Sequence, residues 1–354
     1  MKASKVQANI IFSQQVTVEL KKIVTKYSSN QIFLLTETIP YNHCLPLIQS
    51  VIDEYAIHVI CISGGENNKS IASCEQVWRE LSVRGAGRKS LLINLGGGLI
   101  TDLGGFVAST FKRGIDFVNI PTTLLSQVDA SLGGKTGVNF NGLKNEIGIF
   151  SEPVAVIIDT EFLKTIDKAN MLSGFAEMIK HGLIKSPEHL AALKAYNLEV
   201  PDYIELERLI AQSNEIKEWH VVNDFRENGI RKSLNFGHTI GHAFESHALH
   251  MNRPILHGYA VVYGMIVELY LSTRICDFSM TECQSLCAWL IKIYGKFEIQ
   301  SSDYKILLEL MSHDKKNVSG KINFTLLNEI GEAKINQHCS MELLHEALTF
   351  YQEL

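Results

Sequence analysis

Two histidines four positions apart, His238 and His242, are the residues whose spacing most directly suggests chemistry. On a helix, side chains at i and i+4 project from the same face, stacked about one turn apart. A third histidine, His257, follows a short distance later in the chain. Such a concentration of imidazoles is typical of a metal site, of an acid–base group, or of both. The alternative interpretation is that these are ordinary surface or core histidines.

The surrounding residues limit which metal chemistry the pair can serve. Thr239 follows the first histidine, so the glutamate base of the H-E-x-x-H metalloprotease helix is absent. Glu177 lies among apolar neighbours, and a buried carboxylate needs a cation or hydrogen-bond donors. A metal ion held by Glu177, one histidine of the pair and His257 would meet that need. Three protein ligands with one open position is the arrangement of catalytic zinc sites.

A glycine-rich turn earlier in the chain suggests a second site, for a phosphate group. The apolar run 91–95 leads directly into glycines 96–98, and Asp102 follows in the next segment. A strand, a glycine turn and the start of a helix allow backbone N–H groups to face an anion. Thr101 replaces the third glycine of G-x-G-x-x-G, so this is not the ordinary dinucleotide fingerprint. A purely structural glycine turn is the alternative.

Two lysines within glycine-rich segments point to an anionic substrate. Lys135 and Lys144 lie in predicted loops between apolar strands, in a chain whose net charge is −5. Local cations in an acidic chain are suited to binding carboxylates or phosphates. Glu66 follows another predicted strand, and its carboxylate can accept two hydrogen bonds from a ribose. For each of these residues, a solvated polar loop is the alternative.

Two kinds of structure are expected to position these residues. Up to about residue 160, short β-branched runs alternate with helical stretches, which is typical of a parallel α/β sheet. The strand candidates are residues 31–35, 58–62, 90–95, 117–120 and 154–158. The later amphipathic segments are residues 173–184, 204–222, 257–276 and 281–294, followed by one strand candidate at 321–327. We therefore expect an α/β domain over residues 1–160 and a mainly α-helical domain over residues 161–354.

Composition excludes several classes of protein. The chain has 354 residues, of which 46% are hydrophobic and 20% charged, an ordinary balance for about two domains. The net charge of −5 argues against a nucleic-acid or membrane-surface partner. No apolar run approaches the ~20 residues of a membrane span, and the N-terminus has no apolar signal segment. Seven scattered cysteines without a C-x-x-C pair indicate a reducing cytoplasm.

Taken together and in this order, the motifs resemble those of the 3-dehydroquinate synthase family, within the sugar-phosphate cyclase superfamily. The similarity extends over almost the whole chain. The motifs that carry it are glycines 96–98 with Asp102, Phe111-Lys112-Arg113-Gly114, PTTLLSQVD at 121–129, Gly133-Gly134-Lys135-Thr136, Ala176-Glu177 with Lys180, LNFGHTIGH at 234–242, and His257-Gly258. A chance match to all of these motifs is not credible.

The resemblance implies a Rossmann-like domain for NAD, a helical domain for metal and substrate, and a homodimer. It implies zinc as the metal, which cobalt can replace. The implied reaction converts 3-deoxy-D-arabino-heptulosonate 7-phosphate to 3-dehydroquinate and phosphate, a lyase step of the shikimate pathway towards chorismate and the aromatic amino acids. NAD is not consumed, because the oxidised ring hydroxyl is reduced again after phosphate has left.

The resemblance also implies roles for individual residues. Glu177, His238 and His257 match the zinc ligands, and His242 matches a residue near the substrate phosphate. Arg113 matches an arginine that reaches the phosphate from the neighbouring subunit. The residues that match the catalytic and substrate-binding shell are Asp129, Lys135, Asn145, Lys180, Lys217, Glu227, Arg231, Asn235 and Lys316. The residues that match the NAD contacts are Gly65, Glu66, Lys69, Gly97, Gly98, Asp102, Thr122, Thr123, Lys144 and Thr165.

One residue departs from the family pattern. Many members carry a glutamate two residues after the third zinc ligand, where this chain has Tyr259. A tyrosine cannot supply the same charge behind the metal. Because all three ligands are present, we expect altered tuning of the metal rather than lost activity.

Other functions share parts of this pattern. 2-Deoxy-scyllo-inosose synthase and 2-epi-5-epi-valiolone synthase use the same NAD and metal apparatus but differ around the substrate. Lys135, Arg231, Asn235 and His242 favour the dehydroquinate reaction, since a substrate carboxylate needs an additional cation. A metal-dependent polyol dehydrogenase would produce net NADH. A non-catalytic NAD- or metal-binding protein would show a broken ligand set.

Overall fold

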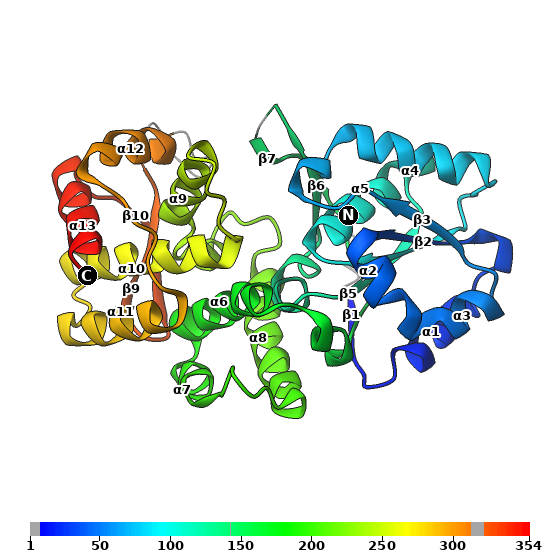
Figure 1. Cartoon of the computed structure of the whole chain (residues 1–354), viewed down its shortest axis with the longest axis horizontal. Helices are drawn as coiled ribbons and strands as arrows, with labels where there is room; N and C mark the ends of the chain where they lie inside the picture. Colours follow the sequence, from blue (N-terminus) through cyan, green and yellow to red (C-terminus); the bar gives the residue numbers. More distant parts are fainter. Residues whose placement is uncertain (1–7, 142, 313–321) are drawn as a thin grey trace. The chain divides into compact units, whose positions relative to one another are not determined.

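The computed structural model describes residues 8–141, 143–312 and 322–354, and the chain forms two compact units. The first unit comprises residues 1–167 and 202–211, and the second comprises residues 168–201 and 212–354. The main boundary therefore lies after Asp167, slightly later than the change in sequence pattern suggests. Figure 1 colours the chain from its N-terminus in blue to its C-terminus in red.

The first unit is built on a six-stranded sheet in which every described pairing is parallel. In spatial order its strands are β1 (Asn9–Phe12), β8 (Ala155–Ile158), β5 (Asp116–Pro121), β4 (Leu91–Gly96), β2 (Ile32–Glu37) and β3 (His58–Ile62). The expectation of a parallel α/β sheet is confirmed, and β1 is an additional strand that the sequence pattern does not reveal.

Helices cover both faces of this sheet. They are α1 (Val16–Val24), α2 (Thr38–His43), α3 (Gln49–Glu54), α4 (Ile71–Val83) and α5 (Gly98–Thr110). Ile32 and Leu34 of β2 pack in one core with α1 and α3, whereas Phe33 and Leu35 pack in another with α4 and α5. Figure 1 shows these helix pairs on opposite sides of the strands. Burial on both faces explains why the strands are continuous apolar runs.

A separate antiparallel hairpin occupies the region where the sequence suggests loops. β6 (Lys135–Phe140) pairs with β7 (Leu143–Phe150), and β6 packs against α5. Lys135 begins β6 and Lys144 lies on β7, so the prediction that both lysines lie in loops is wrong. Nearly every residue of β7 is exposed, and a strand without a buried face has no alternating apolar pattern to reveal it.

The second unit is mainly helical, as predicted. Its helices are α6 (Lys168–Lys185), α7 (Pro187–Ala195), α8 (Tyr203–Asn223, which begins in the first unit), α9 (His238–His250), α10 (His257–Ile275), α11 (Met280–Tyr294), α12 (Tyr304–Ser312) and α13 (Met341–Glu353). A small antiparallel sheet joins β9 (Phe324–Glu329) to β10 (Glu332–Gln337).

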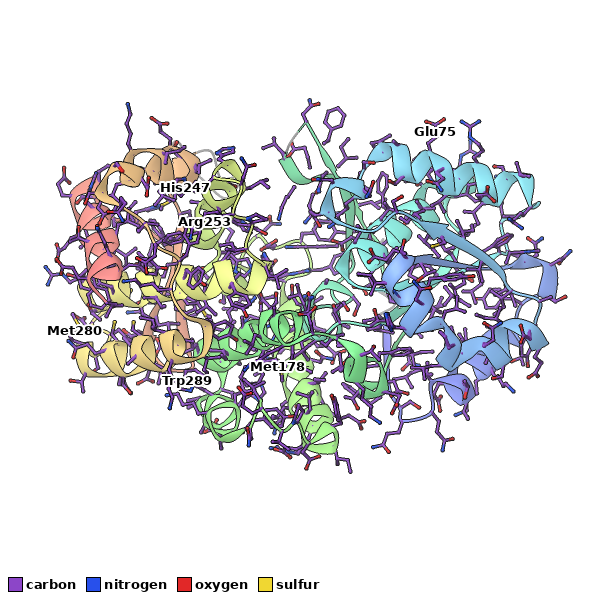
Figure 2. The ribbon with its side chains drawn as sticks, viewed as in Figure 1. Glu75, Met178, His247, Arg253, Met280 and Trp289 are labelled. Carbon is purple, nitrogen blue, oxygen red and sulfur yellow. The ribbon has the colours of Figure 1, made fainter. Side chains whose placement is uncertain are left out.

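The centre of the second unit is α10, which is buried along most of its length. It packs against α6, α9, α11 and α13. Met178 of α6, labelled in Figure 2, is fully buried in this unit. Because α10 is surrounded by other helices, its apolar residues extend around the whole helix rather than along one face. Among the described helices, none combines the length and apolar character that crossing a bilayer requires.

Candidate functional site

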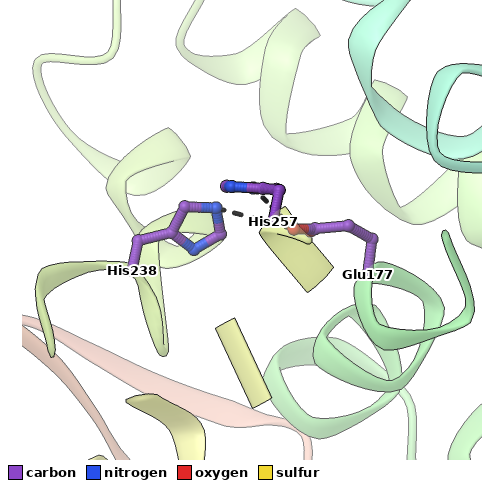
Figure 3. A group of neighbouring side chains, drawn as sticks. All are labelled: Glu177, His238 and His257. Carbon is purple, nitrogen blue, oxygen red and sulfur yellow. Dashed lines mark ion pairs between the residues drawn. The ribbon is translucent and has the colours of Figure 1, made fainter. Parts of the chain in front are cut away.

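Three helices of the second unit bring Glu177, His238 and His257 together. Glu177 lies within α6, whereas each histidine is the first residue of its helix, α9 or α10. Oε1 of Glu177 is 3.6 Å from Nε2 of His238 and 3.5 Å from Nε2 of His257, and Figure 3 marks these ion pairs. One potential ligand atom from each residue lies within 4.8 Å of the other two.

Glycines beside the histidines let these helices approach closely. A Cβ on Gly258 would overlap the carbonyl oxygen of Ser173, so α10 contacts α6 only because a side chain is missing there. A Cβ on Gly241 would lie 2.8 Å from the carbonyl oxygen of Ala260, which imposes a similar requirement on α9 and α10. The glycines of the GHTIGH and HG motifs therefore permit the helix packing that positions Glu177, His238 and His257.

The start of α9 is held by a buried carboxylate. Gly237 has φ +79°, in the left-handed region that glycine adopts readily. Glu268 of α10 accepts hydrogen bonds from the backbone N–H groups of Gly237 at 2.6 Å and Ile240 at 3.4 Å. A carboxylate at this position satisfies N–H groups that have no partner within the helix. A residue of α10 therefore holds the backbone on either side of His238 in place.

Both histidines direct Nε2 towards Glu177 and have Nδ1 near a separate acceptor. Nδ1 of His238 lies 3.2 Å from the carbonyl oxygen of Phe236. Nδ1 of His257 lies 3.7 Å from Oε2 of Glu245, an ion-pair distance. A proton on Nδ1 leaves the Nε2 lone pair available to a metal. Burial lowers the pKa of His257, but Glu177 and Glu245 outweigh burial and raise the pKa to about 9.

The donor set fits a divalent metal ion. One carboxylate and two imidazoles are the protein ligands of several catalytic zinc sites, with a further position left for water or substrate. Glu177 is fully buried, and its Oε2 makes an ion pair with Lys180. Its Oε1 is the oxygen that faces the two histidines. A buried carboxylate between two imidazole nitrogens is suited to share a cation with them.

His242 lies beside this group without belonging to it. Its ring centroid is 5.5 Å from that of His238 and 6.0 Å from that of His257. Among the described residues, the group of potential ligand atoms that joins both His238 and His257 to Glu177 does not include His242. Different roles for the two histidines of α9 remain a hypothesis.

The loop before α9 orders further predicted substrate residues. Asn235 donates a hydrogen bond to Oε1 of Glu227 at 2.8 Å, and Glu227 has φ +59°, an uncommon conformation for a residue with a side chain. Asp224 accepts a backbone hydrogen bond from Arg231 at 3.1 Å and from two neighbouring N–H groups. Burial raises the pKa of Asp224, but these backbone bonds outweigh burial and lower it below its usual value.

Buried cations are a second feature of this unit. Lys180, Lys217 and Arg231 are all at most 5% exposed. Burying a cation is costly unless an anion compensates it, and for Lys180 that anion is Glu177. Lys316, the other cation predicted to contact substrate, lies outside the described residues.

In the first unit, the glycine turn joins β4 to α5 as expected. Gly97 is the N-cap residue of α5 and Gly98 is its first residue. A Cβ on Gly97 would lie 3.3 Å from Thr123, and one on Gly98 would lie 3.2 Å from Ala130, so the neighbours press only moderately on either position. α5 therefore begins with two glycines, at a helix end whose first N–H groups have no partner within the helix.

Polar residues around this turn are linked in pairs. Lys69 makes a 2.5 Å ion pair with Asp102, and Lys69 is buried. Asn139 donates to Oε1 of Glu66 at 2.8 Å and accepts a hydrogen bond from the backbone N–H of Asn145 at 2.9 Å. Of the other predicted residues in this unit, Thr122 is buried, Thr123 and Asp129 are partly buried, and Gly65, Arg113, Lys135, Lys144 and Thr165 are exposed.

Comparison with known proteins identifies the family. The family models for the N-terminal and C-terminal parts of 3-dehydroquinate synthase match residues 59–173 and 174–317. A 3-dehydroquinate synthase from Parabacteroides distasonis is 46% identical over 347 residues, covering 98% of both chains. This chain belongs to the 3-dehydroquinate synthase family.

Solved structures show the same fold in related cyclases. A 2-epi-5-epi-valiolone synthase from Streptomyces hygroscopicus subsp. jinggangensis, solved with NAD⁺ and Zn²⁺ bound, matches with a TM-score of 0.88 at 21% identity, covering 100% of this chain and 99% of the other. A 2-deoxy-scyllo-inosose synthase solved with carbaglucose-6-phosphate, NAD⁺ and Co²⁺ matches with a TM-score of 0.86 at 23% identity, covering 98% and 96%. At this identity the likeness concerns the fold.

Three further residues contact residues of the two candidate sites, although the sequence analysis does not single them out. Glu245 follows His242 by three positions and His238 by seven, so helical periodicity places all three on one face of α9. That spacing is the signal that could have revealed it. Asn139 and Glu268 carry no comparable signal, because their partners are distant in sequence.

The unusual Tyr259 lies in an aromatic environment. Its ring packs edge-on against Tyr294, with ring centroids 5.3 Å apart. The Tyr294 hydroxyl donates to the carbonyl oxygen of Leu172 of α6 at 3.0 Å. Tyr259 therefore adds packing between α10 and α11, a role that a glutamate at the same position would not fill.

Proposed function

We propose that this chain catalyses the 3-dehydroquinate synthase reaction on 3-deoxy-D-arabino-heptulosonate 7-phosphate, with NAD and a divalent metal ion, zinc or cobalt. The observation that carries the proposal is the convergence of Glu177, His238 and His257, in a chain 46% identical to a 3-dehydroquinate synthase over nearly its whole length. A divalent ion bound there would act as a Lewis acid and lower the pKa of the hydroxyl being oxidised.

The metal-binding residues have distinct tasks in this proposal. Glu177, His238 and His257 would hold the ion, and Oε1 of Glu177 is the carboxylate oxygen that faces both histidines. Lys180 pairs with the other oxygen of Glu177 and thereby orients that carboxylate. His242 is left to contact the substrate phosphate.

The remaining substrate residues bind an anion and orient it. The cations Lys135, Lys180, Lys217, Arg231 and Lys316 bind the substrate carboxylate and phosphate, the amides of Asn145 and Asn235 orient its hydroxyls, and Asp129 and Glu227 accept hydrogen bonds from it. Proton removal next to an oxidised carbon needs little help from a general base, and the substrate phosphate can itself accept that proton. Positioning therefore accounts for most of the work of these residues.

The first unit supplies the proposed NAD site. Gly97 and Gly98 present the N-terminus of α5 to the pyrophosphate, and Glu66 accepts hydrogen bonds from a ribose. The other proposed contacts are Gly65, Lys69, Asp102, Thr122, Thr123, Lys144 and Thr165. NAD would accept the hydride and return it within one turnover, so no NADH accumulates.

The proposed activity is tested by phosphate release. The purified protein, supplied with NAD and zinc or cobalt, is expected to release phosphate from the heptulosonate phosphate without net NADH. Glucose 6-phosphate and sedoheptulose 7-phosphate, assayed in parallel, are expected to be inert. A preference for either sugar phosphate would assign the chain to another cyclase reaction, and net NADH formation would indicate a polyol dehydrogenase.

We also propose a homodimer in which Arg113 reaches the substrate phosphate bound by the partner subunit. Arg113 is exposed at the end of a short turn with φ +70°, next to Lys112 with φ +50°. These two residues and Arg88 line a hollow of about 540 Å³. Cations held outward in a strained turn are suited to bind an anion on a second molecule. A solution mass of twice 39.6 kDa is expected.

Subunit mixing tests the role of Arg113. Arg113→Ala and Lys180→Ala should each be nearly inactive alone. Unfolded together and refolded as a mixture, they should recover about a quarter of wild-type activity, because half of the dimers are mixed and each mixed dimer regains one of two sites. A mixture as inactive as its components would show that Arg113 serves its own subunit.

A cytoplasmic location completes the proposal. All seven cysteines are free thiols, and three of them, Cys276, Cys283 and Cys287, lie on helices of the second unit or directly after one. Buried Cys283 and Cys287 have their sulfur atoms 4.0 Å apart and unbonded. Free thiols in such proximity fit a reducing compartment.

A further inference from the structure

The histidines of the metal group are anchored in different ways. The outer nitrogen of His238 faces a main-chain carbonyl, that of Phe236. The outer nitrogen of His257 faces a side chain, the carboxylate of Glu245. We infer that Glu245 is a positioning residue, which orients His257 and increases the affinity of the site for its metal. The inference rests on the proposed metal-dependent function.

The placement of Glu245 supports this role. Glu245 lies on α9 about two helical turns after His238 and on the same face of the helix. The helix that carries His238 therefore also supplies the carboxylate beside His257. Its side chain is only 13% exposed. A carboxylate so nearly buried requires a compensating donor, and His257 provides an imidazole nitrogen 3.7 Å away.

The consequence for the metal follows from imidazole chemistry. His257 lies between two carboxylates, Glu177 at Nε2 and Glu245 at Nδ1. An ion held by Glu177 and the histidines would be bound by Nε2 of His257, and the proton on Nδ1 would remain beside Glu245. The negative charge of Glu245 then stabilises that N–H, fixes the tautomer and the rotation of the ring, and makes Nε2 a stronger donor.

Tyr259 is close to His257 in sequence and is the other candidate for orienting its imidazole, but it packs against a different residue. It is two residues from His257 on α10, but its ring lies against Tyr294. A phenol also lacks the full negative charge that strengthens an imidazole donor. Glu245 is therefore the carboxylate behind His257 in the described part of the chain.

Glu245→Gln tests the inference, because it removes the charge and keeps the shape. Zinc affinity, measured by competition with a chromophoric chelator, should fall about 10- to 100-fold, the usual effect of losing such a partner. The visible spectrum of the Co²⁺-loaded protein should change, since it reports the geometry of the ligands. The melting temperature of the metal-free protein should stay near that of the wild type, and turnover should recover at saturating zinc.

Two further variants separate positioning from folding. Glu245→Asp keeps the charge and should bind zinc more tightly than Glu245→Gln. Glu309→Gln makes the same change on the exposed side of α12 and should match the wild type. Wild-type zinc affinity in Glu245→Gln would overturn the inference. Equal weakening in the Asp and Gln variants, with lowered melting temperatures of both metal-free proteins, would overturn it too. Failure of the wild type itself to bind zinc or cobalt would instead refute the proposed function.

Discussion

The two candidate sites of this chain use glycine for opposite purposes. At the turn between β4 and α5, Gly97 and Gly98 begin the helix, and in the proposed function the cofactor would bind to their main-chain N–H groups. In the second unit, Gly241 and Gly258 bring helices into contact so that side chains of three helices converge. One site is a surface of main chain, and the other is an assembly of side chains that depends on helix packing.

This difference predicts different sensitivities to mutation. A backbone site tolerates changes of most side chains but loses affinity when a Cβ covers its N–H groups. A side-chain site loses its ligand when one donor is removed, and also when the packing behind the donors shifts. Substitutions in the two units can therefore test whether stability and binding are separable in one site and coupled in the other.

The largest effect is expected at the metal-binding side chains. His238→Ala should abolish zinc binding and lower kcat by about 10³-fold, because a Lewis acid contributes several kcal/mol and each 1.36 kcal/mol is tenfold. His242→Ala should keep zinc while lowering turnover. Zinc content by atomic absorption and steady-state phosphate release measure the two effects. Equal zinc loss in both variants would show that the roles of the two histidines are wrongly divided.

An intermediate effect is expected at the helix contact. Gly258→Ala places a methyl group against the Ser173 carbonyl and should lower the free energy of unfolding by about 3 kcal/mol, the upper end of the usual cost of overpacking. Zinc affinity should fall with it, because His257 moves together with α10. Urea denaturation of the metal-free protein and chelator competition provide the measurements. A variant that loses stability but binds zinc normally would refute the coupling of packing and ligation.

The smallest effect on stability is expected at the backbone site. Gly97 has φ −77° and ψ −166°, which alanine can adopt, and its nearest neighbour would be 3.3 Å from a Cβ. Gly97→Ala should therefore change the free energy of unfolding by less than about 1 kcal/mol. NAD affinity should nevertheless fall about tenfold, as expected for a lost hydrogen bond to a charged group. Calorimetric titration with NAD would detect this, and unchanged affinity would place the cofactor elsewhere.

Sequence patterns predicted the parts of the fold that are buried on both sides. The strands at 32–37 and 91–96 are mostly apolar because helices cover both faces, and the sequence pattern identifies such runs directly. The β6–β7 hairpin escaped prediction since most of its residues are exposed and glycines interrupt it. The pattern of apolar residues in a helix or strand reflects which of its faces is buried. A helix or strand that is mostly exposed therefore has no distinctive sequence pattern.

For the metal group, spacing within the chain identified candidates but not their combination. His238 and His242 share a face of α9, and spacing treats them alike. Their distinction depends on Glu177, which is distant in sequence and reaches them only through the contact of α6 with α10. The resemblance to the family indicated that Glu177 belongs with His238 and His257. Glu245 remained unnoticed because it contacts a proposed metal ligand rather than serving as one.

The two ligand histidines are the first residues of their helices, and this has an electrostatic consequence. Each helix N-terminus carries a partial positive charge equivalent to roughly half an elementary charge. At α9 the carboxylate of Glu268 offsets this charge, whereas the N-terminal end of α10 would raise the electrostatic potential beside His257. A substrate oxygen that became negatively charged beside His257 would be stabilised by α10 as well as by a bound metal ion, so the scaffold itself would favour the alkoxide over the neutral alcohol.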